Sequence, residues 1–331
     1  MASHLFAPIA DRAASDGERT FIETPAGRRV SYADVLAESG RLANALRALG
    51  VRTGDRVAVQ VEKSPEAFLL YLACVRAGAV FLPLNTAYTL AELDYFFGDA
   101  EPALAVCDPA RADQVRAVAV GRGVPAVETL GADGRGTLTA RAAPLPTEFP
   151  DADRGPQDLA ALLYTSGTTG RSKGAMLTHE NLASNARALV ALWRFGRDDV
   201  LLHALPIFHT HGLFTAATTT LFAGGSLLFL PRFDPDEVMR LLPRATSMMG
   251  VPTYYVRLLQ HPALSRETTR HVRLFTSGSA PLLPETHREW RERTGHAILE
   301  RYGMTETNMT TSNPYDGDRV PGTVGFPLPD V

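Results

Sequence analysis

The sequence predicts an α/β protein in which doubly wound, mostly parallel β-sheets carry helices on both faces. Three observations support this fold class. From residue 55 onward, short apolar segments alternate with longer segments of helical periodicity, which is typical of βαβ units. Glycine and proline separate these segments, and no fixed-period repeat occurs. A length of 331 residues with 45% hydrophobic content is enough for two or more subdomains with buried cores.

The N-terminal fifty residues predict a hairpin followed by a helix. Two strand-like segments, 20–23 and 29–32, flank the turn Pro25-Ala26-Gly27. The helix is expected to begin with a capping box, because Asp34 lies three residues after Ser31.

The next segments predict alternating strands and helices. A strand at 55–60 precedes a helix at 67–77, which Ser64-Pro65-Glu66 caps and Gly78 ends. The stretch 135–156 is rich in Ala, Pro, Gly and Asp and predicts a surface connection. A further helix is expected near 180–194, with strands at 79–83, 103–107, 159–164, 200–204, 226–230, 247–250 and 274–276.

Composition limits the partners and the compartment. A net charge of -3 gives no electrostatic footprint for nucleic acid, and no stretch approaches the roughly 18 uninterrupted apolar residues of a membrane span. The first residues lack the pattern of a secretory signal. Cys74 and Cys107 lack metal or redox spacing and are expected to be buried thiols. We therefore expect a cytoplasmic protein with small-molecule partners, no nucleic acid and no membrane, and leave its oligomeric state open.

A loop with the composition of a phosphate site follows the strand-like segment 162–164. Residues 165–174 read Thr-Ser-Gly-Thr-Thr-Gly-Arg-Ser-Lys-Gly. Glycines let backbone N–H groups converge on an anion, and Lys173 offsets the charge of a polyphosphate. The loop is not of the Walker A type, because Gly174 follows the lysine and the next helix is expected only at 178–181. The alternative for such a segment is a surface loop.

This string resembles the signature loop of the adenylate-forming superfamily, which includes acyl-CoA synthetases, firefly-type luciferases and peptide-synthetase adenylation domains. Four more segments resemble motifs of that family in the same order: an acyl-pocket motif at 206–213, a strand-to-helix turn at 250–253, an adenine-side loop at 277–282 and a nucleotide and metal motif at 300–307. The resemblance covers essentially the whole chain. It implies the N-terminal domain of these enzymes, with two packed α/β sheets.

The resemblance also implies a division of the chain. The first subdomain is expected at 51–195 with the phosphate loop at its end, the second at 1–50 plus 196–320, and the start of a third at 321–331. Family members add a terminal barrel, a ribose-binding aspartate, a hinge and a C-terminal domain with a lysine that promotes adenylation, and we recognise none of these in the sequence. We therefore expect a truncated part with little full turnover.

The implied activity is that of an ATP-dependent acid:CoA ligase. A carboxylate attacks the α-phosphate of ATP with loss of pyrophosphate, and the thiol of CoA then displaces AMP, with Mg²⁺ as the metal. Such catalysis rests on positioning and electrostatic stabilisation. The resemblance implies nucleotide contacts for Thr165, Ser166, Gly167, Thr168, Thr169, Gly170, Lys173, Ser279, Ala280, Pro281, Glu300, Tyr302, Gly303 and Thr305.

Four residues are the implied catalytic groups: Lys173, Thr305, Glu306 and His209. Glu306 matches the magnesium-binding glutamate of the family, and Thr165 is a second candidate ligand. The alternative for Glu306 is that it caps a helix or lies on a solvated face. His209 matches a side chain beside the substrate carboxylate, although a buried core histidine is its alternative. His211 is a weaker candidate that could lie behind the site. Neither histidine is expected to act as a general base, because the attacking carboxylate carries no proton at neutral pH.

Two arginines indicate which acid is activated. Arg301 occupies the position that points into the acyl pocket in the family, and Arg257 lies one helical turn after Thr253. A guanidinium facing an acyl pocket would be a buried unpaired charge unless the substrate carried a second carboxylate. In the alternatives, Arg257 is a surface arginine and Arg301 pairs with Glu300 or another acid.

The set Arg257, Ser279 and Arg301 resembles the distal-carboxylate site of malonyl-CoA synthetases, with His209 and Met304 as further substrate contacts. Loss of a buried charged partner costs about 3–5 kcal/mol, so malonate should be preferred over acetate or propionate by roughly two to three and a half powers of ten. One methyl group is worth only about 1–3 kcal/mol, so methylmalonate or another short diacid stays open. The sequence also leaves open a ligase for a different small acid, an amino-acid adenylation domain, a luciferase-like oxidase and an inactive nucleotide-binding fragment.

Overall fold

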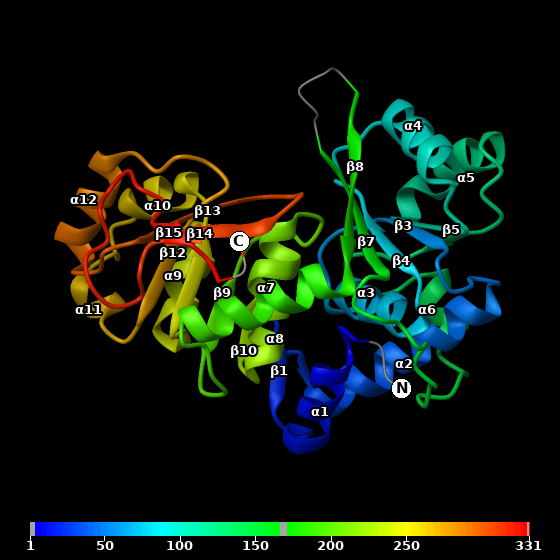
Figure 1. Cartoon of the computed structure of the whole chain (residues 1–331), viewed down its shortest axis with the longest axis horizontal. Helices are drawn as coiled ribbons and strands as arrows, with labels where there is room; N and C mark the ends of the chain where they lie inside the picture. Colours follow the sequence, from blue (N-terminus) through cyan, green and yellow to red (C-terminus); the bar gives the residue numbers. More distant parts are fainter. Residues whose placement is uncertain (1–3, 166–170, 330) are drawn as a thin grey trace. The chain divides into compact units, whose positions relative to one another are not determined.

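The computed structural model describes residues 4–165, 171–329 and 331. These residues form two compact units, each built on one β-sheet (Figure 1). Unit 1 comprises residues 4–19, 31–165, 171–183 and 207–209, and unit 2 comprises residues 20–30, 184–206, 210–329 and 331. In both sheets most neighbouring strands run parallel, which confirms the predicted fold class.

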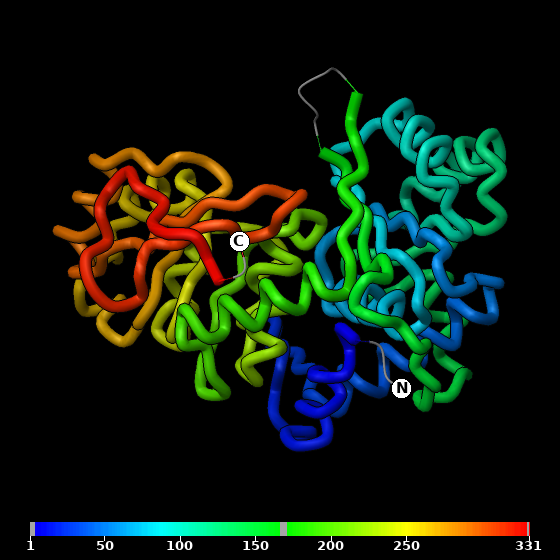
Figure 2. The backbone as a smooth tube through the Cα atoms, viewed as in Figure 1, coloured from blue at the N-terminus to red at the C-terminus, as the bar shows by residue number. Residues whose placement is uncertain are grey.

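Unit 1 is centred on a six-stranded sheet of order β6-β5-β3-β4-β7-β8. Its first five strands are parallel, whereas β8 runs antiparallel to β7, and the two form a long hairpin (Figure 2). The strands are β3 (Arg56–Gln60), β4 (Val80–Pro83), β5 (Leu104–Cys107), β6 (Val127–Thr129), β7 (Leu159–Thr165) and β8 (Lys173–Thr178).

Helices cover both faces of this sheet. Phe96 of α4 and Val115 of α5 pack with Ala58 and Leu82 of the sheet on one face, and α2 and α3 lie on the other (Figure 1). The helices are α1 (Ala7–Asp16), α2 (Tyr32–Ala48), α3 (Pro65–Ala77), α4 (Leu90–Ala100), η1 (Pro109–Arg111), α5 (Ala112–Gly121), α6 (Thr137–Ala142) and the start of α7 (His179–Leu192).

Unit 2 is centred on a nine-stranded sheet of order β15-β14-β13-β12-β11-β9-β10-β1-β2. The run from β1 to β13 is parallel, and β14 and β15 are antiparallel additions at one edge. The strands are β1 (Thr20–Glu23), β2 (Arg29–Ser31), β9 (Val200–His203), β10 (Ser226–Phe229), β11 (Ser247–Gly250), β12 (Leu274–Ser277), β13 (Leu299–Met304), β14 (Asn308–Ser312) and β15 (Phe326–Pro327).

The core of unit 2 gathers around Trp290. Its indole makes edge-to-face contacts with Tyr255 at 4.9 Å and with Phe275 at 5.0 Å between ring centroids, an arrangement that aromatic pairs prefer. This packing joins two helices to β12. The helices that follow α7 are η2 (His211–Thr218, a π-helix), α8 (Thr219–Ala223), α9 (Pro235–Leu241), η3 (Leu242–Arg244), α10 (Pro252–Leu259), α11 (Arg266–Thr269) and α12 (Pro284–Thr294).

Signals that depend on neighbouring residues are confirmed. Ser31 and Asp34 form the predicted capping box of α2. The hydroxyl of Ser64 caps α3, and Gly78 ends it in the left-handed conformation with a φ of 71°. The helix after the phosphate loop begins at His179, as expected. Ser31 and Ser64 accept hydrogen bonds from backbone N–H groups three residues on, and the backbone N–H of Gly78 bonds to carbonyls of the preceding turn, so no distant contact is needed to specify these caps.

One expectation about the N-terminal region differs from the structure. Residues 1–50 are expected in the second subdomain, but of these only 20–30 lie in unit 2. The reason is Arg76 of α3, whose buried guanidinium donates to the carbonyl of Leu36 at 2.5 Å and to the hydroxyl of Ser39 at 3.0 Å, both in α2. These bonds place α2 in unit 1.

The predicted surface connection at 135–156 is more regular than expected, because it contains α6. Arg41 donates to the carbonyls of Ala143 and Leu145, both at 2.9 Å. Arg76 also pairs with Asp151 at 2.6 Å. Two arginines of unit 1 therefore hold this segment against α2 and α3.

Both cysteines are free and buried, as predicted. Burial raises the pKa of the Cys74 thiol, and it raises the pKa of Cys107 to about 11. Because the thiolate is the reactive form, we expect both thiols to react slowly with iodoacetamide at pH 8 in the native protein and rapidly in urea. Mass spectrometry of the alkylated protein measures this, and fast labelling of either cysteine without urea would contradict the burial.

Candidate active site

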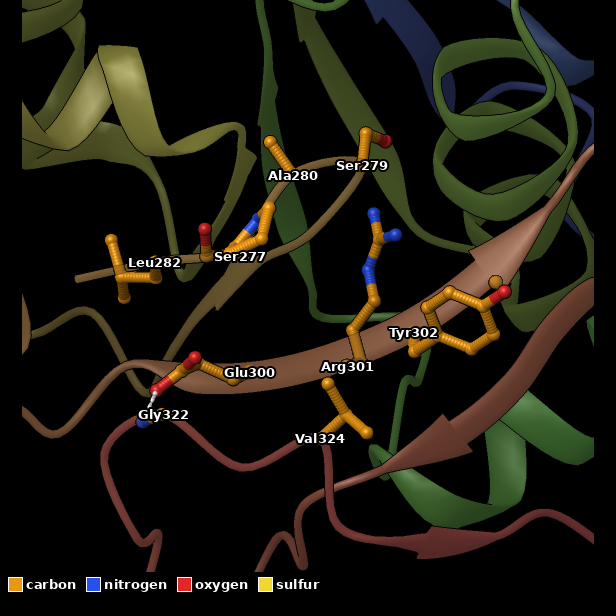
Figure 3. Close-up of a pocket in the computed structure, with 11 residues that line it drawn as sticks. Ser277, Ser279, Ala280, Leu282, Glu300, Arg301, Tyr302, Gly322 and Val324 are labelled. Atoms are coloured by element: carbon orange, nitrogen blue, oxygen red, sulfur yellow. Dashed lines mark hydrogen bonds between the residues drawn. The ribbon is translucent and has the colours of Figure 1, made fainter. Parts of the chain in front are cut away.

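A cavity of about 410 Å³ lies in unit 2 at the carboxyl ends of β12 and β13 (Figure 3). Open α/β sheets bind ligands at this end of their strands. Two sequence motifs that lie about twenty residues apart meet here. The lining residues are Ser277, Ser279, Ala280, Pro281, Leu282, Glu300, Arg301, Tyr302, Gly303, Gly322 and Val324. Seven of them, Ser279, Ala280, Pro281, Glu300, Arg301, Tyr302 and Gly303, were predicted from the sequence.

A buried histidine holds the loop that follows β12. Ser279 has a φ of 67°, in the left-handed region, and its hydroxyl lies 3.1 Å from the Nδ1 atom of His211. His211 is the first residue of the π-helix η2. The chain can enter this helix because position 212 is a glycine: a Cβ there would lie 2.0 Å from the carbonyl oxygen of Pro206. His211 therefore contacts Ser279, a predicted substrate residue, without lining the cavity itself.

Alternation along β13 separates Glu300 from Arg301. The Glu300 carboxylate accepts a hydrogen bond of 2.9 Å from the backbone N–H of Gly322. Burial raises the pKa of this carboxyl, and the bond from Gly322 partly offsets the effect. Arg301 points away from Glu300, toward the loop of Ser279 (Figure 3). The alternative in which Arg301 pairs with Glu300 is therefore wrong.

Arg301 is a buried cation. The residue is only 3% exposed. Its Nε and Nη2 atoms are buried and have no hydrogen-bond partner among the residues that the structure describes. Desolvation lowers the pKa of the guanidinium to about 9, so it stays charged at neutral pH. A charge in such a place is costly unless an anion accepts its hydrogen bonds.

The base of the phosphate loop lies in unit 1. Residues 166–170, which include the predicted contacts Ser166, Gly167, Thr168, Thr169 and Gly170, lie outside the described residues. On either side, Thr165 of β7 pairs with Lys173 of β8, and the Lys173 side chain is exposed. Tyr164 donates to a carboxylate oxygen of Asp99 at 2.5 Å, and Tyr95 donates to the carbonyl of Ser172 at 2.8 Å. Side chains of α4 thus anchor both ends of the loop.

Three predicted substrate residues do not line the cavity: Arg257, His209 and Met304. Arg257 lies on the exposed side of α10, with its guanidinium 5.0 Å from the ring centroid of Phe233. The spacing from Thr253 correctly places both on one face of the helix, but this is the exposed face, because Tyr255 and Leu258 turn the other face to the core. His209 belongs to unit 1, where it is exposed and its ring centroid lies 4.6 Å from that of Phe208.

A model of the family described as AMP-binding enzyme matches residues 9–331. The chain belongs to this family. Among curated members, it is 35% identical over 349 residues to the mitochondrial malonate–CoA ligase of Mus musculus, which covers 98% of this chain and 58% of the relative. It is 37% identical over 284 residues to a feruloyl-CoA synthase of Amycolatopsis, which covers 85% of this chain and 55% of the relative.

Among solved structures, the chain resembles ATP-bound MatB from Rhodopseudomonas palustris. The two superpose with a TM-score of 0.96 at 64% sequence identity, over 99% of this chain and 65% of that chain. The resemblance to the N-terminal domain of adenylate-forming enzymes is therefore confirmed. The chain spans 58% of the murine relative and 65% of the MatB chain.

The family implies a magnesium site in the segment that contains Thr305 and Glu306. Thr305 and Glu306 lie in the turn between β13 and β14, and Glu306 is exposed. Among the described residues, no group of three or more His, Cys, Asp or Glu could hold a metal ion. One carboxylate nevertheless fits Mg²⁺, which in nucleotide enzymes is bound by one or two carboxylates and by the phosphates of its substrate. Thr165 belongs to the other unit, so its part in the metal site stays a prediction.

Tyr302 lines the cavity and is 48% exposed, so its ring can stack with a planar ligand. Its hydroxyl lies 3.8 Å from the sulfur of Met304, which is also exposed and does not line the cavity. Gly322 and Val324 line the cavity from the segment after β14. They carry no signal in the sequence, because only the fold brings that segment beside β13.

No helix in the described part of the chain is long and apolar enough to cross a bilayer.

Proposed function

We propose that this chain forms the nucleotide- and acid-binding portion of an ATP-dependent acid:CoA ligase that activates malonate through an acyl-adenylate. The observation that carries the proposal is the buried guanidinium of Arg301, which faces the cavity beside Ser279. A substrate whose far end is a second carboxylate supplies the acceptor for its Nε–H and Nη2–H groups, in the paired geometry that guanidinium and carboxylate prefer.

The arrangement assigns a task to each group of residues. Arg301 and Ser279 hold the far carboxylate of malonate, which leaves the near carboxylate free to attack the α-phosphate. Tyr302 and the loop from Ser279 to Pro281 hold the adenine. Thr305 would contact the α-phosphate and Glu306 would bind Mg²⁺. Lys173 and the rest of the phosphate loop hold the β- and γ-phosphates. Pyrophosphate leaves in this step, and the thiol of CoA displaces AMP in the next.

The proposal has less support for three further substrate contacts, Arg257, His209 and Met304. None of them lines the cavity. The exposed His209 is suited to contact a ligand that approaches from solvent, and desolvation lowers the pKa of its imidazole, which favours the neutral form. A neutral imidazole can donate a hydrogen bond to a carboxylate without removing a proton from it.

A second candidate function is a ligase for an aromatic acid, because a feruloyl-CoA synthase has a sequence identity close to that of the malonate–CoA ligase, although over a smaller part of the chain. An uncharged aromatic substituent offers no acceptor to Arg301, and its entry would leave the guanidinium buried and unpaired. This favours a short dicarboxylic acid. Methylmalonate stays within the proposal, since one methyl group is worth only about 1–3 kcal/mol. The two free, buried thiols support a reducing compartment such as the cytoplasm.

The proposal is tested by binding and by exchange. Calorimetric titration of the chain, with ATP and Mg²⁺ present, is expected to give an affinity for malonate roughly two to three and a half powers of ten above that for propionate. Malonate-dependent exchange between ATP and pyrophosphate is expected when the chain is extended at its C-terminus with the corresponding part of MatB, and little is expected without the extension. Equal affinities for malonate and propionate would refute the substrate, while exchange driven by propionate alone would leave only the ligase class.

Replacement of His211 by phenylalanine should weaken malonate binding about fivefold, because the Ser279 hydroxyl loses a hydrogen bond worth about 1 kcal/mol. The variant His211→Asn, which keeps a polar group, should lose less. ATP affinity serves as the internal control in both titrations. Wild-type malonate affinity in His211→Phe would show that the histidine does not position Ser279.

A further inference from the structure

Gly278 forms the surface on which the Arg301 guanidinium lies. A Cβ atom at position 278 would be 2.3 Å from Nη1, 2.6 Å from Cζ and 2.8 Å from Nε of Arg301. Non-bonded carbon atoms are most stable about 3.5–4.0 Å from their neighbours. No residue larger than glycine therefore fits at 278 while Arg301 keeps this position.

The backbone does not by itself require glycine at this position. Gly278 is absent from the glycines with positive φ, whereas the next residue, Ser279, has a φ of 67° and still carries a side chain. The need for glycine is thus a matter of space. The atoms that a Cβ would meet belong to the far end of a flexible side chain, so an added methyl group would displace the guanidinium and leave the backbone in place.

We propose that Gly278 is a specificity-determining residue of the acyl pocket. Its missing side chain creates the space in which Arg301 can present Nε–H and Nη2–H to a second carboxylate. With alanine at 278 the guanidinium moves away from that position, and the pocket loses its selection for a dicarboxylic acid. The inference rests on the proposed function, because it assumes that Arg301 binds the far carboxylate.

The proposal requires the two positions to be coupled. If Gly278 acts only through Arg301, its replacement has no further effect once the guanidinium has been removed. A double-mutant cycle measures this, since substitutions at contacting residues are non-additive when they act on one interaction. Binding of malonate and of propionate to the 331-residue chain, with ATP and Mg²⁺ present, is the measurement.

We expect Gly278→Ala to bind malonate at least about tenfold more weakly and Arg301→Met at least about a hundredfold more weakly than the wild type. The double variant should match Arg301→Met within about twofold. Affinities for ATP and propionate should not change. Gly196→Ala is the matched control, because this glycine is also in unit 2, has no positive φ and would place its Cβ in open space; it should bind malonate as the wild type does.

Wild-type malonate affinity in Gly278→Ala would overturn the inference. So would additive effects, in which the double variant binds malonate more weakly than Arg301→Met by the same factor as Gly278→Ala does relative to the wild type. Wild-type malonate affinity in Arg301→Met would instead overturn the proposed function. If Gly278→Ala fails to fold, the double variant decides: the proposal predicts that Arg301→Met restores folding, because the methyl group then has room. A double variant that also fails to fold would overturn it.

Discussion

Replacing Arg301 by methionine is expected to abolish selective malonate binding and, at the same time, to stabilise the ligand-free protein. The first effect follows from the loss of the partner for a desolvated carboxylate, which costs about 3–5 kcal/mol, or roughly two to three and a half powers of ten in affinity. The second follows because Nε and Nη2 of Arg301 are buried without a hydrogen-bond partner among the described residues. Exchange of a buried ion for an apolar side chain of similar length commonly stabilises a protein by about 1–4 kcal/mol.

The opposite signs distinguish a binding residue from a structural one. Replacing a residue that serves only the fold makes the protein less stable. Replacing a residue whose buried charge destabilises the ligand-free protein makes it more stable but removes the ligand binding. Calorimetry gives the affinity, and urea unfolding followed by tryptophan fluorescence gives the stability. Both tryptophans of the chain, Trp193 and Trp290, lie in unit 2, so the fluorescence reports the unit that contains Arg301.

Arg257→Met is the matched control for this experiment. Arg257 is exposed on α10, so its replacement should change the free energy of unfolding by less than about 0.5 kcal/mol and leave malonate affinity within a few fold of the wild type. A large loss of malonate affinity in Arg257→Met would show that this residue binds malonate, as its sequence position predicts. Destabilisation of Arg301→Met with unchanged malonate binding would contradict the proposed role of Arg301.

The second large effect is expected far from the cavity, at Asp199. Its carboxylate accepts hydrogen bonds from Nε of Arg273 at 2.7 Å, from Nη2 of Arg273 at 2.8 Å, from the hydroxyl of Thr246 at 2.7 Å and from the backbone N–H of Gly196 at 2.8 Å. These residues directly precede β9, β11 and β12 or lie beside them. Asp199 is 6% exposed. Asp199→Asn therefore leaves a largely buried arginine without its counter-ion and should destabilise unit 2 by about 3 kcal/mol.

The stabilisation by Asp199 should depend on pH in a defined direction. Burial by itself would raise the pKa of this carboxyl, but the hydrogen bonds from Arg273, Thr246 and Gly196 outweigh it, and the pKa lies below its usual value. A carboxyl whose pKa is lower in the folded state than in the unfolded state stabilises the fold above the unfolded pKa of about 3.9. The contribution is then lost as the pH falls through the lower, folded value.

Urea unfolding of the wild type and of Asp199→Asn, followed by tryptophan fluorescence, tests both statements. The difference in unfolding free energy should be constant from about pH 5 to pH 8 and should shrink below about pH 4. Asp316→Asn is the control, because Asp316 pairs with Arg194 in the same unit but both side chains are more than half exposed. Its effect should not exceed about 1 kcal/mol. An Asp199→Asn effect no larger than that of the control would contradict the assignment.

Features that depend on near neighbours could be predicted from the sequence. The capping box of Ser31 and Asp34, the cap at Ser64 and the left-handed Gly78 each involve side-chain and backbone groups a few residues apart, so the order of residues specifies them. Alternating apolar segments predicted the α/β class for the same reason. The ordered motifs indicated the family, and two of them proved to share one cavity.

The outward position of Arg257 could not be predicted in this way. Helical spacing states which residues share a face, but it does not state whether that face meets the core, the cavity or solvent. On α10 the packing of Tyr255 against Trp290 decides this and turns Arg257 outward. In the same way, Arg76 assigns α2 to unit 1 through bonds that span about forty residues of sequence.

The fold class, the family and a buried cation at position 301 could be predicted from the sequence, because each depends on local order or on a contiguous motif. The hydrogen bond of Glu300 with Gly322, the contact of His211 with Ser279 and the space that Gly278 leaves for the Arg301 guanidinium arise only in the folded chain. The physical reason is that hydrogen-bond partners and free space depend on atoms that lie close together only after the strands have paired.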